Sequence, residues 1–256
     1  MVVSIKKVQS ESKGLYERYE ITDGSYKYNF NRVVSSTTGE NAYRIVKLTK
    51  NYTAITNPGN WEKAFALTGH DLVGGMHGHE KFVSLYIVKD TEHINPYLNT
   101  VYSGSKIIIV QNSDIYNPAM KDQIICRAVQ TYTFENNKLT INTKYNWKIT
   151  YTLETFYNGM FPSNQNVFKY GLINGYTQET LVNNNGEFTT EKTSAKGTVW
   201  NNNNTIIISM ESNTSGPAWI KCSSAYNKLY LARVYEGSMN ITKGTTTEVN
   251  TIYRII

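Results

Sequence analysis

The chain has 256 residues and a formal net charge of +6, from 26 Lys and Arg against 20 Asp and Glu. The basic residues are spread without a dense block, which argues against a dedicated nucleic-acid site. No stretch approaches the roughly 20 apolar residues that a membrane helix needs, and residues 1–14 lack an apolar segment of signal-peptide length. We therefore expect no nucleic-acid or membrane partner and no export signal.

Tyrosine is the most unusual component of the composition, with 20 tyrosines against 8 phenylalanines. Its flat apolar face and polar tip suit half-exposed strands and surfaces that bind sugars or proteins. A mildly basic surface also suits an acidic polymer such as a uronic-acid glycan or teichoic acid. Plain strand propensity explains the tyrosines as well, so the composition alone does not choose between these interpretations.

Short apolar runs rich in β-branched and aromatic residues predict strands along most of the chain. They cover residues 43–48, 82–88, 106–111, 124–134, 139–145, 147–156, 188–190, 205–210, 218–222, 229–235 and 250–256. Glu135-Asn136-Asn137-Lys138 predicts a hairpin turn between two of these strands. Helical periodicity is scarce, and residues 60–67 fit a short helix that begins after Asn60.

Turn signals such as Asn57-Pro58-Gly59 and Ser215-Gly216-Pro217 recur at the spacing expected of a sandwich or barrel. Because no repeat or linker interrupts this pattern, residues 36–256 are predicted to form an all-β fold, a single large antiparallel β-sandwich of jelly-roll type. Residues 1–35 are polar and Tyr-rich, and they form either an outer strand or an arm that packs on a partner. Cys126 and Cys222 lie in strand-like segments, as a disulfide or as two buried thiols.

The segment Gly74-Gly75-Met76-His77-Gly78-His79-Glu80 concentrates titratable side chains, because three of the four histidines lie within residues 70–79. In one regular strand over residues 76–88, His77 and His79 would share a face, and Glu80 would lie on the other. Glu80 joins the histidines only if a glycine forms a bulge or if the strand starts after Glu80.

Three interpretations of this segment are open. A metal site would use His77 and His79, with a third ligand from Asp71, Glu80 or His93, but the spacing fits the cupin pattern poorly. Acid–base chemistry on a polysaccharide would need a base, an acid and a group that neutralises the substrate carboxylate. In a purely structural role, the glycines would turn the chain and the histidines would bond neighbouring backbone.

For β-elimination, the candidate catalytic residues are His77, Glu80, Arg127, Tyr151 and Tyr230. The candidate substrate-binding residues are Tyr157, Lys228, Asn146 and Trp219. A hydrolase would instead need two carboxylates that face each other across a cleft, such as Glu80 with Glu154 or with Asp71. No cofactor and no metal are predicted.

Residues 72–80, followed by residues 82–88 and Asp90, resemble a pattern of tail-fibre and tail-spike proteins from phages and prophages of low-GC Gram-positive bacteria. That pattern is Gly-Gly-x-His-Gly-x-Glu and then a strand, so His77 and Glu80 match it directly. Tyr157-Asn158-Gly159-Met160-Phe161-Pro162 is similar to the same group. Trp219 with residues 226–235 resembles the C-terminal sheet of concanavalin-like β-sandwiches, which include polysaccharide lyases. The Arg-rich strand and the Gln-Ile-His triplet of alginate lyases are absent.

The resemblance, which covers residues 60–235, implies a virion-associated β-sandwich that recognises a bacterial polysaccharide and, as a lyase, depolymerises it. His77 and Glu80 would line its groove. Further implied partners are two other copies, in a homotrimer, or other virion tail proteins, and the location is the virion or the extracellular medium after lysis. The alternative function is a receptor-binding or structural tail module without chemistry.

Overall fold

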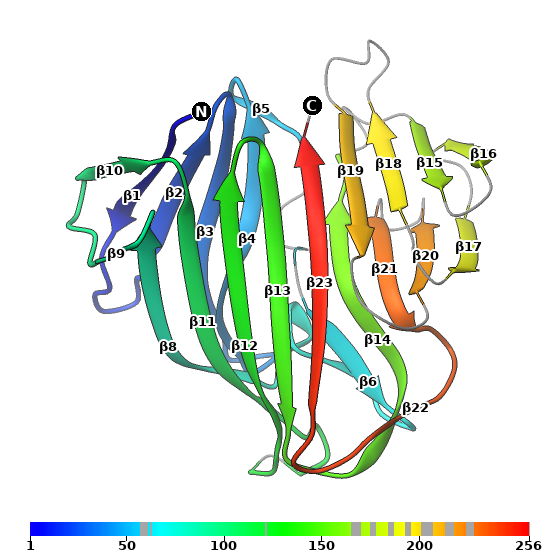
Figure 1. The fold of residues 1–256 in the computed structure, drawn as a ribbon. Helices are drawn as coiled ribbons and strands as arrows, with labels where there is room; N and C mark the ends of the chain where they lie inside the picture. Colours follow the sequence, from blue (N-terminus) through cyan, green and yellow to red (C-terminus); the bar gives the residue numbers. More distant parts are fainter. Residues whose placement is uncertain are drawn as a thin grey trace.

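In the computed structural model, residues 1–56, 61, 63–120, 122–164, 170–174, 178–183, 187–192, 196–200, 207–212, 218–223 and 228–255 are described. This part of the chain contains no α-helix and one short 3₁₀ turn, η1 (Gly75–His77). The strands form two sheets packed face to face, so the expected all-β sandwich is confirmed (Figure 1). The expected turns at Asn57-Pro58-Gly59 and Ser215-Gly216-Pro217, as well as Tyr226, lie outside the described residues.

The larger sheet has 16 strands and runs in the order β10-β1-β2-β3-β4-β8-β11-β12-β13-β23-β19-β18-β15-β16, with β5 beside β4 and β9 beside β8. Its strands are β1 (Val3–Gln9), β2 (Arg18–Asp23), β3 (Tyr26–Ser35), β4 (Glu40–Lys50), β5 (Thr53–Ala54), β8 (Glu80–Lys89), β9 (Glu92–Ile94), β10 (Val101–Gly104), β11 (Ile107–Tyr116), β12 (Ile124–Glu135), β13 (Lys138–Trp147), β15 (Tyr170–Asn174), β16 (Gln178–Asn183), β18 (Lys196–Trp200), β19 (Ile207–Ser212) and β23 (Thr246–Ile255).

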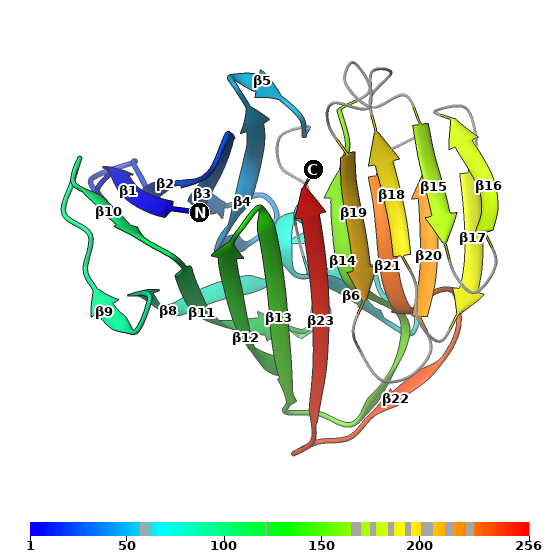
Figure 2. The same ribbon diagram turned by 45° about the horizontal axis from the view of Figure 1, so that its top comes forward.

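The smaller sheet has seven strands in the order β17-β20-β21-β14-β6-β7, with β22 beside β14. They are β6 (Ala64–Leu67), β7 (Leu72–Val73), β14 (Tyr151–Pro162), β17 (Glu187–Lys192), β20 (Ala218–Ser223), β21 (Lys228–Val234) and β22 (Met239–Ile241). Figures 1 and 2 show this sheet behind one half of the larger sheet, while β1–β4 turn back behind the other half.

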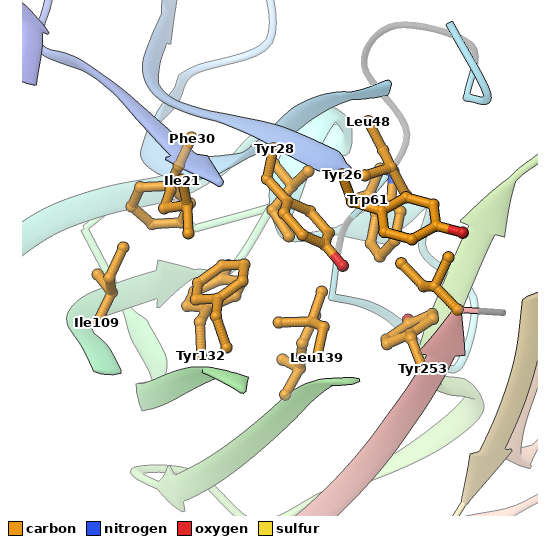
Figure 3. Close-up of a cluster of buried hydrophobic side chains, with 14 of the residues drawn as sticks. Ile21, Tyr26, Tyr28, Phe30, Leu48, Trp61, Ile109, Tyr132, Leu139 and Tyr253 are labelled. Atoms are coloured by element: carbon orange, nitrogen blue, oxygen red, sulfur yellow. The ribbon is translucent and has the colours of Figure 1, made fainter. Parts of the chain in front are cut away.

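The main core lies between β1–β4 on one side and β11–β13 with β23 on the other. Figure 3 shows Ile21, Tyr28 and Phe30 opposite Ile109, Tyr132 and Leu139. The Phe30 and Tyr132 rings meet edge to face, with centroids 4.9 Å apart. Within residues 1–35, β1, β2 and β3 are strands of the larger sheet, and their inward side chains belong to this core.

Local features of the chain follow the expectations in part. The predicted hairpin is confirmed: Glu135 pairs with Lys138, and Asn136 and Asn137 between them have φ of 51° and 55°. The helix expected over residues 60–67 is wrong for residues 64–67, which form β6 because they pair with β14. Cys126 is a buried free thiol, and the side chain of Cys222 lies outside the described residues.

Residues 76–88 do not form one regular strand. η1 ends at His77, and β8 begins at Glu80. The bulge is at Val83 rather than at a glycine, since Phe82 pairs with Ser113 and Ser84 with Asn112. This extra residue returns the later part of β8 to the same face as Glu80, so that both halves of the strand reach the core.

β4 and β8 join the two halves of the larger sheet. They run parallel and pair through Glu40 with Glu80 and Asn41 with Lys81, whereas the other strand pairs of the described chain are antiparallel. This short junction positions the segment that carries the histidines.

Candidate functional site

The glycines of residues 74–78 let the chain turn tightly before β8. Gly78 has φ of 82°, and a Cβ atom there would lie 1.7 Å from the carbonyl oxygen of Thr38. The Gly74 amide donates to the Gly78 carbonyl at 2.9 Å, and the His79 amide donates to the Thr38 carbonyl at 3.2 Å. Residues 74–79 are therefore fixed against the loop that precedes β4, and only glycine fits at position 78.

Glu80 is fully buried beneath this turn, with 0% of its surface exposed. Its carboxylate lies 2.6 Å from the Lys63 ammonium, and it accepts hydrogen bonds from the Gly75 amide at 2.8 Å and the Ser113 hydroxyl at 2.5 Å. Burial raises the pKa of Glu80, but the Lys63 charge and these hydrogen bonds outweigh it and hold the pKa below its usual value of 4.5.

The expectation that Glu80 lines a groove beside His77 is therefore corrected. The carboxylate points inward and accepts a hydrogen bond from the η1 backbone, which the local sequence does not show. Lys63 is also 95% buried and donates to Gln130 at 3.0 Å. Glu80 thus holds the turn that presents His77, and it has no route to a substrate in this arrangement.

A second buried carboxylate, Glu40, lies across the β4–β8 junction from Glu80. Arg44 donates to it at 2.7 Å. Burial raises the pKa of Glu40, Arg44 opposes this shift, and the nearby Glu80 charge adds to it. Two acids and two bases thus stabilise the junction from inside.

A pocket of about 490 Å³ opens on the outside of the same junction. Its lining is Ser36, Thr37, Thr38, Gly39, Asp71, Leu72, His77, His79, Lys81, Tyr116 and Pro118. The Lys81 ammonium lies 4.3 Å from the centroid of the Tyr116 ring. Two imidazoles, an ammonium and a phenol therefore share one pocket.

His77 is the wall residue with a perturbed pKa. Burial lowers the pKa of its imidazole from the usual 6.5, the positive charge of Lys228 lowers it further, and Asp71 opposes both. At neutral pH the ring is therefore predominantly uncharged and able to accept a proton.

A second hollow of about 410 Å³ continues from this pocket, because both are lined by Asp71 and Pro118. It adds Gly69, His70, Ala119 and Glu154 to the lining. We call the two together the end groove. It lies where β8 begins and β11 ends.

Tyr151 lies near the far side of the end groove. Its ring centroid is 6.3 Å from that of His70, and it lines a further hollow with Thr68 and Thr152. The structure thus brings His77 and Tyr151 to the same end of the sandwich.

Arg127 and Asn146 continue a cross-strand row that begins at Lys81 in the pocket wall, since Lys81 pairs with Asp114, Asp114 with Arg127, and Arg127 with Asn146. The Arg127 guanidinium donates to both oxygens of Asp114, at 2.8 and 2.9 Å, and the Asn146 amide donates to the Arg127 carbonyl at 3.3 Å. Neighbouring strands already supply the partners of both side chains. Arg127 is held in an ion pair, and Asn146 in a cross-strand hydrogen bond.

The other predicted residues form an aromatic cluster on β14, β20 and β21. The Tyr157 and Tyr230 rings are 5.1 Å apart, Trp219 packs against them, and the Lys228 ammonium is 5.8 Å from the Tyr230 ring. Tyr157 and Tyr230 are each 8% exposed, which leaves little ring surface for a ligand. The charge of Lys228 is the connection between this cluster and His77.

Lys63, Lys81 and Tyr116 were not among the site residues predicted from the sequence. The position of Lys63 directly before the apolar run of residues 64–67 could have indicated a buried ion pair, because a charge at the start of a buried strand needs a partner. Lys81 and Tyr116 meet through the pairing of β8 with β11, which no local pattern shows.

Among the described residues, no three or more His, Cys, Asp or Glu side chains lie together as a group that fits a metal ion. Nor does this part of the chain contain a helix of the length and apolarity that a bilayer requires.

No family model matches the chain, and no curated protein does. Solved structures do share its fold. The α-galactosidase from Lactobacillus brevis has a TM-score of 0.58 at 7% identity, over 94% of this chain and 39% of that one. The GH36 α-galactosidase AgaA from Geobacillus stearothermophilus has a TM-score of 0.55 at 10% identity, over 93% and 40%. A putative mutarotase, YeaD, from Salmonella typhimurium has a TM-score of 0.52 at 7% identity, over 97% and 96%.

This chain thus spans less than half the length of the galactosidases, but nearly all of the putative mutarotase. At such low identity the similarity establishes the fold alone. The protein has a β-sandwich fold in common with proteins named for activity on carbohydrates.

Proposed function

We propose that this protein binds an acidic polysaccharide in the end groove and cleaves it by β-elimination, with His77 as the base. The observation that carries the proposal is a neutral imidazole on a rigid turn, in a pocket that also presents Lys81 and Tyr116. The fold shared with α-galactosidases and a putative mutarotase supports a carbohydrate ligand.

The chemistry assigns one task to each group. An imidazole nitrogen of His77 takes the proton from C5 of a uronic acid, while the Lys81 ammonium neutralises the adjacent carboxylate and stabilises the enolate-like intermediate. The C4–C5 double bond forms as the C4–oxygen bond breaks, and the Tyr116 hydroxyl gives its proton to the departing oxygen. Asp71, whose charge raises the pKa of His77, favours the imidazolium that results.

Hydrolysis is the second candidate, because Asp71 and Glu154 line the same hollow. Two carboxylates that flank a glycosidic bond can act as acid and as base or nucleophile. The Glu80 pairs considered from the sequence do not apply, because Glu80 is buried.

Incubation with polygalacturonate and with alginate separates these functions. β-Elimination gives an unsaturated product that absorbs ultraviolet light, and hydrolysis gives reducing ends without that absorbance. His77→Gln should abolish the absorbance and leave the thermal midpoint nearly unchanged, whereas His93→Gln, outside the groove lining, should retain full activity. Reducing ends that vanish in Asp71→Asn and Glu154→Gln would establish the hydrolase, and binding without either product would establish a non-catalytic receptor-binding module.

We also propose that the protein acts on a virion or in the medium after lysis, as a homotrimer or bound to other tail proteins. This part rests on the resemblance of residues 72–90 to tail-fibre and tail-spike sequences. Mass spectrometry of purified particles should find the chain, and light scattering should give the mass of three copies. A monomer absent from particles would refute this part alone.

A further inference from the structure

The outward face of β2, β3 and β4 is a polar surface built by strand register. Two cross-strand rows lie side by side on it. They are Glu20–Asn29–Lys47 and Thr22–Lys27–Thr49. The alternate residues of the same strands, Ile21, Tyr28 and Leu48, point into the core. Period-2 alternation therefore gathers six hydrogen-bonding side chains on one face.

This face is hollowed, with a volume of about 360 Å³. Tyr52 and the β2–β3 turn at Gly24 and Ser25 line it together with the two rows. The Asn51 amide donates to the Ser25 carbonyl at 3.2 Å, which ties the two turns together. We call this hollow the outer-face site.

Tyr52 lies in a conformation that its side chain disfavours. It follows Asn51 in a two-residue turn, since Lys50 pairs with Thr53, and the two turn residues have φ of 46° and 69°. Such turns favour glycine in the second position, because a Cβ atom there is strained. The Tyr52 side chain is nevertheless 96% exposed. Among the described residues it has no ring or hydrogen-bonding partner to offset the strain. Strained residues of this kind concentrate at functional sites.

The charge of the site is positive. Lys27 lies 3.2 Å from Glu20, so these two balance each other. Lys47 makes no ion pair within the part of the chain that the structure describes. The hollow thus offers one ammonium without a counter-charge, a row of neutral donors and acceptors, and one exposed aromatic face.

We propose that the outer-face site binds a sugar unit that carries a carboxylate. The apolar face of the sugar ring packs on Tyr52, its carboxylate pairs with Lys47, and its hydroxyls bond Asn29, Thr22 and Thr49. The ligand class follows from these side chains and does not depend on catalysis in the end groove.

The site lies at the opposite end of β4 from the end groove. Gly39, directly before β4, lines the end groove, while Tyr52 lies two residues after the last residue of β4, Lys50. An 11-residue strand extends about 35 Å at 3.2–3.4 Å per residue. A long chain can therefore engage both sites, and the outer-face site then raises affinity for polymers without altering turnover of short oligomers.

The test measures calorimetric binding of galacturonate oligomers to variants built on the double change His77→Gln and Lys81→Gln, so that neither cleavage nor carboxylate binding in the end groove interferes. Tyr52→Gly should weaken binding about tenfold and raise the thermal midpoint, because it removes the ring and relieves the turn. Tyr52→Phe should bind like the parent, and so should Tyr97→Gly, which removes another well-exposed tyrosine. Lys47→Gln should abolish the preference for galacturonate over neutral galactose oligomers.

A Tyr52→Gly variant that is more stable and binds with unchanged affinity would overturn the proposal, as would charge preference that survives Lys47→Gln. Failure of the end groove is distinguishable from both. A wild-type chain that binds through Tyr52 but releases no product would refute the proposed cleavage and leave the outer-face site standing.

Discussion

Replacing Glu80 with Gln tests the buried ion pair that supports the His77 turn. The amide keeps the shape of the side chain and can still accept from the Gly75 amide. Lys63, which is 5% exposed, then loses its direct ion-pair partner. Removing one partner of a buried pair costs about 3–5 kcal/mol. For a chain of this size that corresponds to a fall of about 6–20 °C in thermal midpoint.

The assay is denaturant unfolding at neutral pH, with Lys63→Met and the double variant measured beside Glu80→Gln. Each single change should be strongly destabilising, and the double variant should recover much of the loss, because no unpaired charge remains.

The dependence of stability on pH in the acid range gives an independent check of the buried ion pair. The folded-state pKa of Glu80 is below 4.5, so its contribution to stability is complete above pH 4.5 and is lost as the pH falls through the folded-state value. The stability curves of the wild type and Glu80→Gln should therefore converge at low pH. A loss below about 1 kcal/mol at neutral pH, or single effects that simply add, would refute the buried pair.

Three further outcomes follow from the site. Gly78→Ala places a Cβ atom 1.7 Å from the Thr38 carbonyl at φ of 82°, so it should cost about 2–4 kcal/mol in chemical unfolding; a neutral effect would contradict the turn geometry. Arg127→Ala removes an ion pair in which the arginine side chain is 47% exposed, so the free energy of unfolding should fall by at most about 1 kcal/mol. Cleavage should not change, and a loss of cleavage would restore the catalytic role of Arg127. Lys228→Gln should raise the pKa of His77 toward 6.5, because a positive charge that lowers it is gone. Since His77 must be neutral to act as a base, the acid limb of the pH–activity profile should then move to higher pH, and an unmoved limb would contradict that coupling.

The features predicted correctly from the sequence are those that depend on neighbouring residues. The turn at Asn136-Asn137 needs only side chains that tolerate positive φ between two alternating strands. Strands such as β11 and β12 were visible in the same way, from continuous β-branched and aromatic residues.

The inward position of Glu80 could not be predicted locally. It depends on Lys63, 17 positions earlier, and on Ser113, 33 positions later, which the fold brings together. The bulge at Val83 likewise follows from the register with β11. His77 and Tyr151 lie at one end of the sandwich because β6 pairs with β14. The residues of β6 were expected to form a helix, so this pairing was not predicted.

The short parallel contact between β4 and β8 has a mechanical consequence. The larger sheet consists of two blocks of antiparallel ladders, and strand pairing between the blocks is limited to two residue pairs. The end groove spans that joint, with Thr38 and Gly39 on one block and His79 and Lys81 on the other. The proposed polymer ligand would contact both blocks and so add links across this joint. Occupancy of the groove would therefore reinforce the sandwich under load.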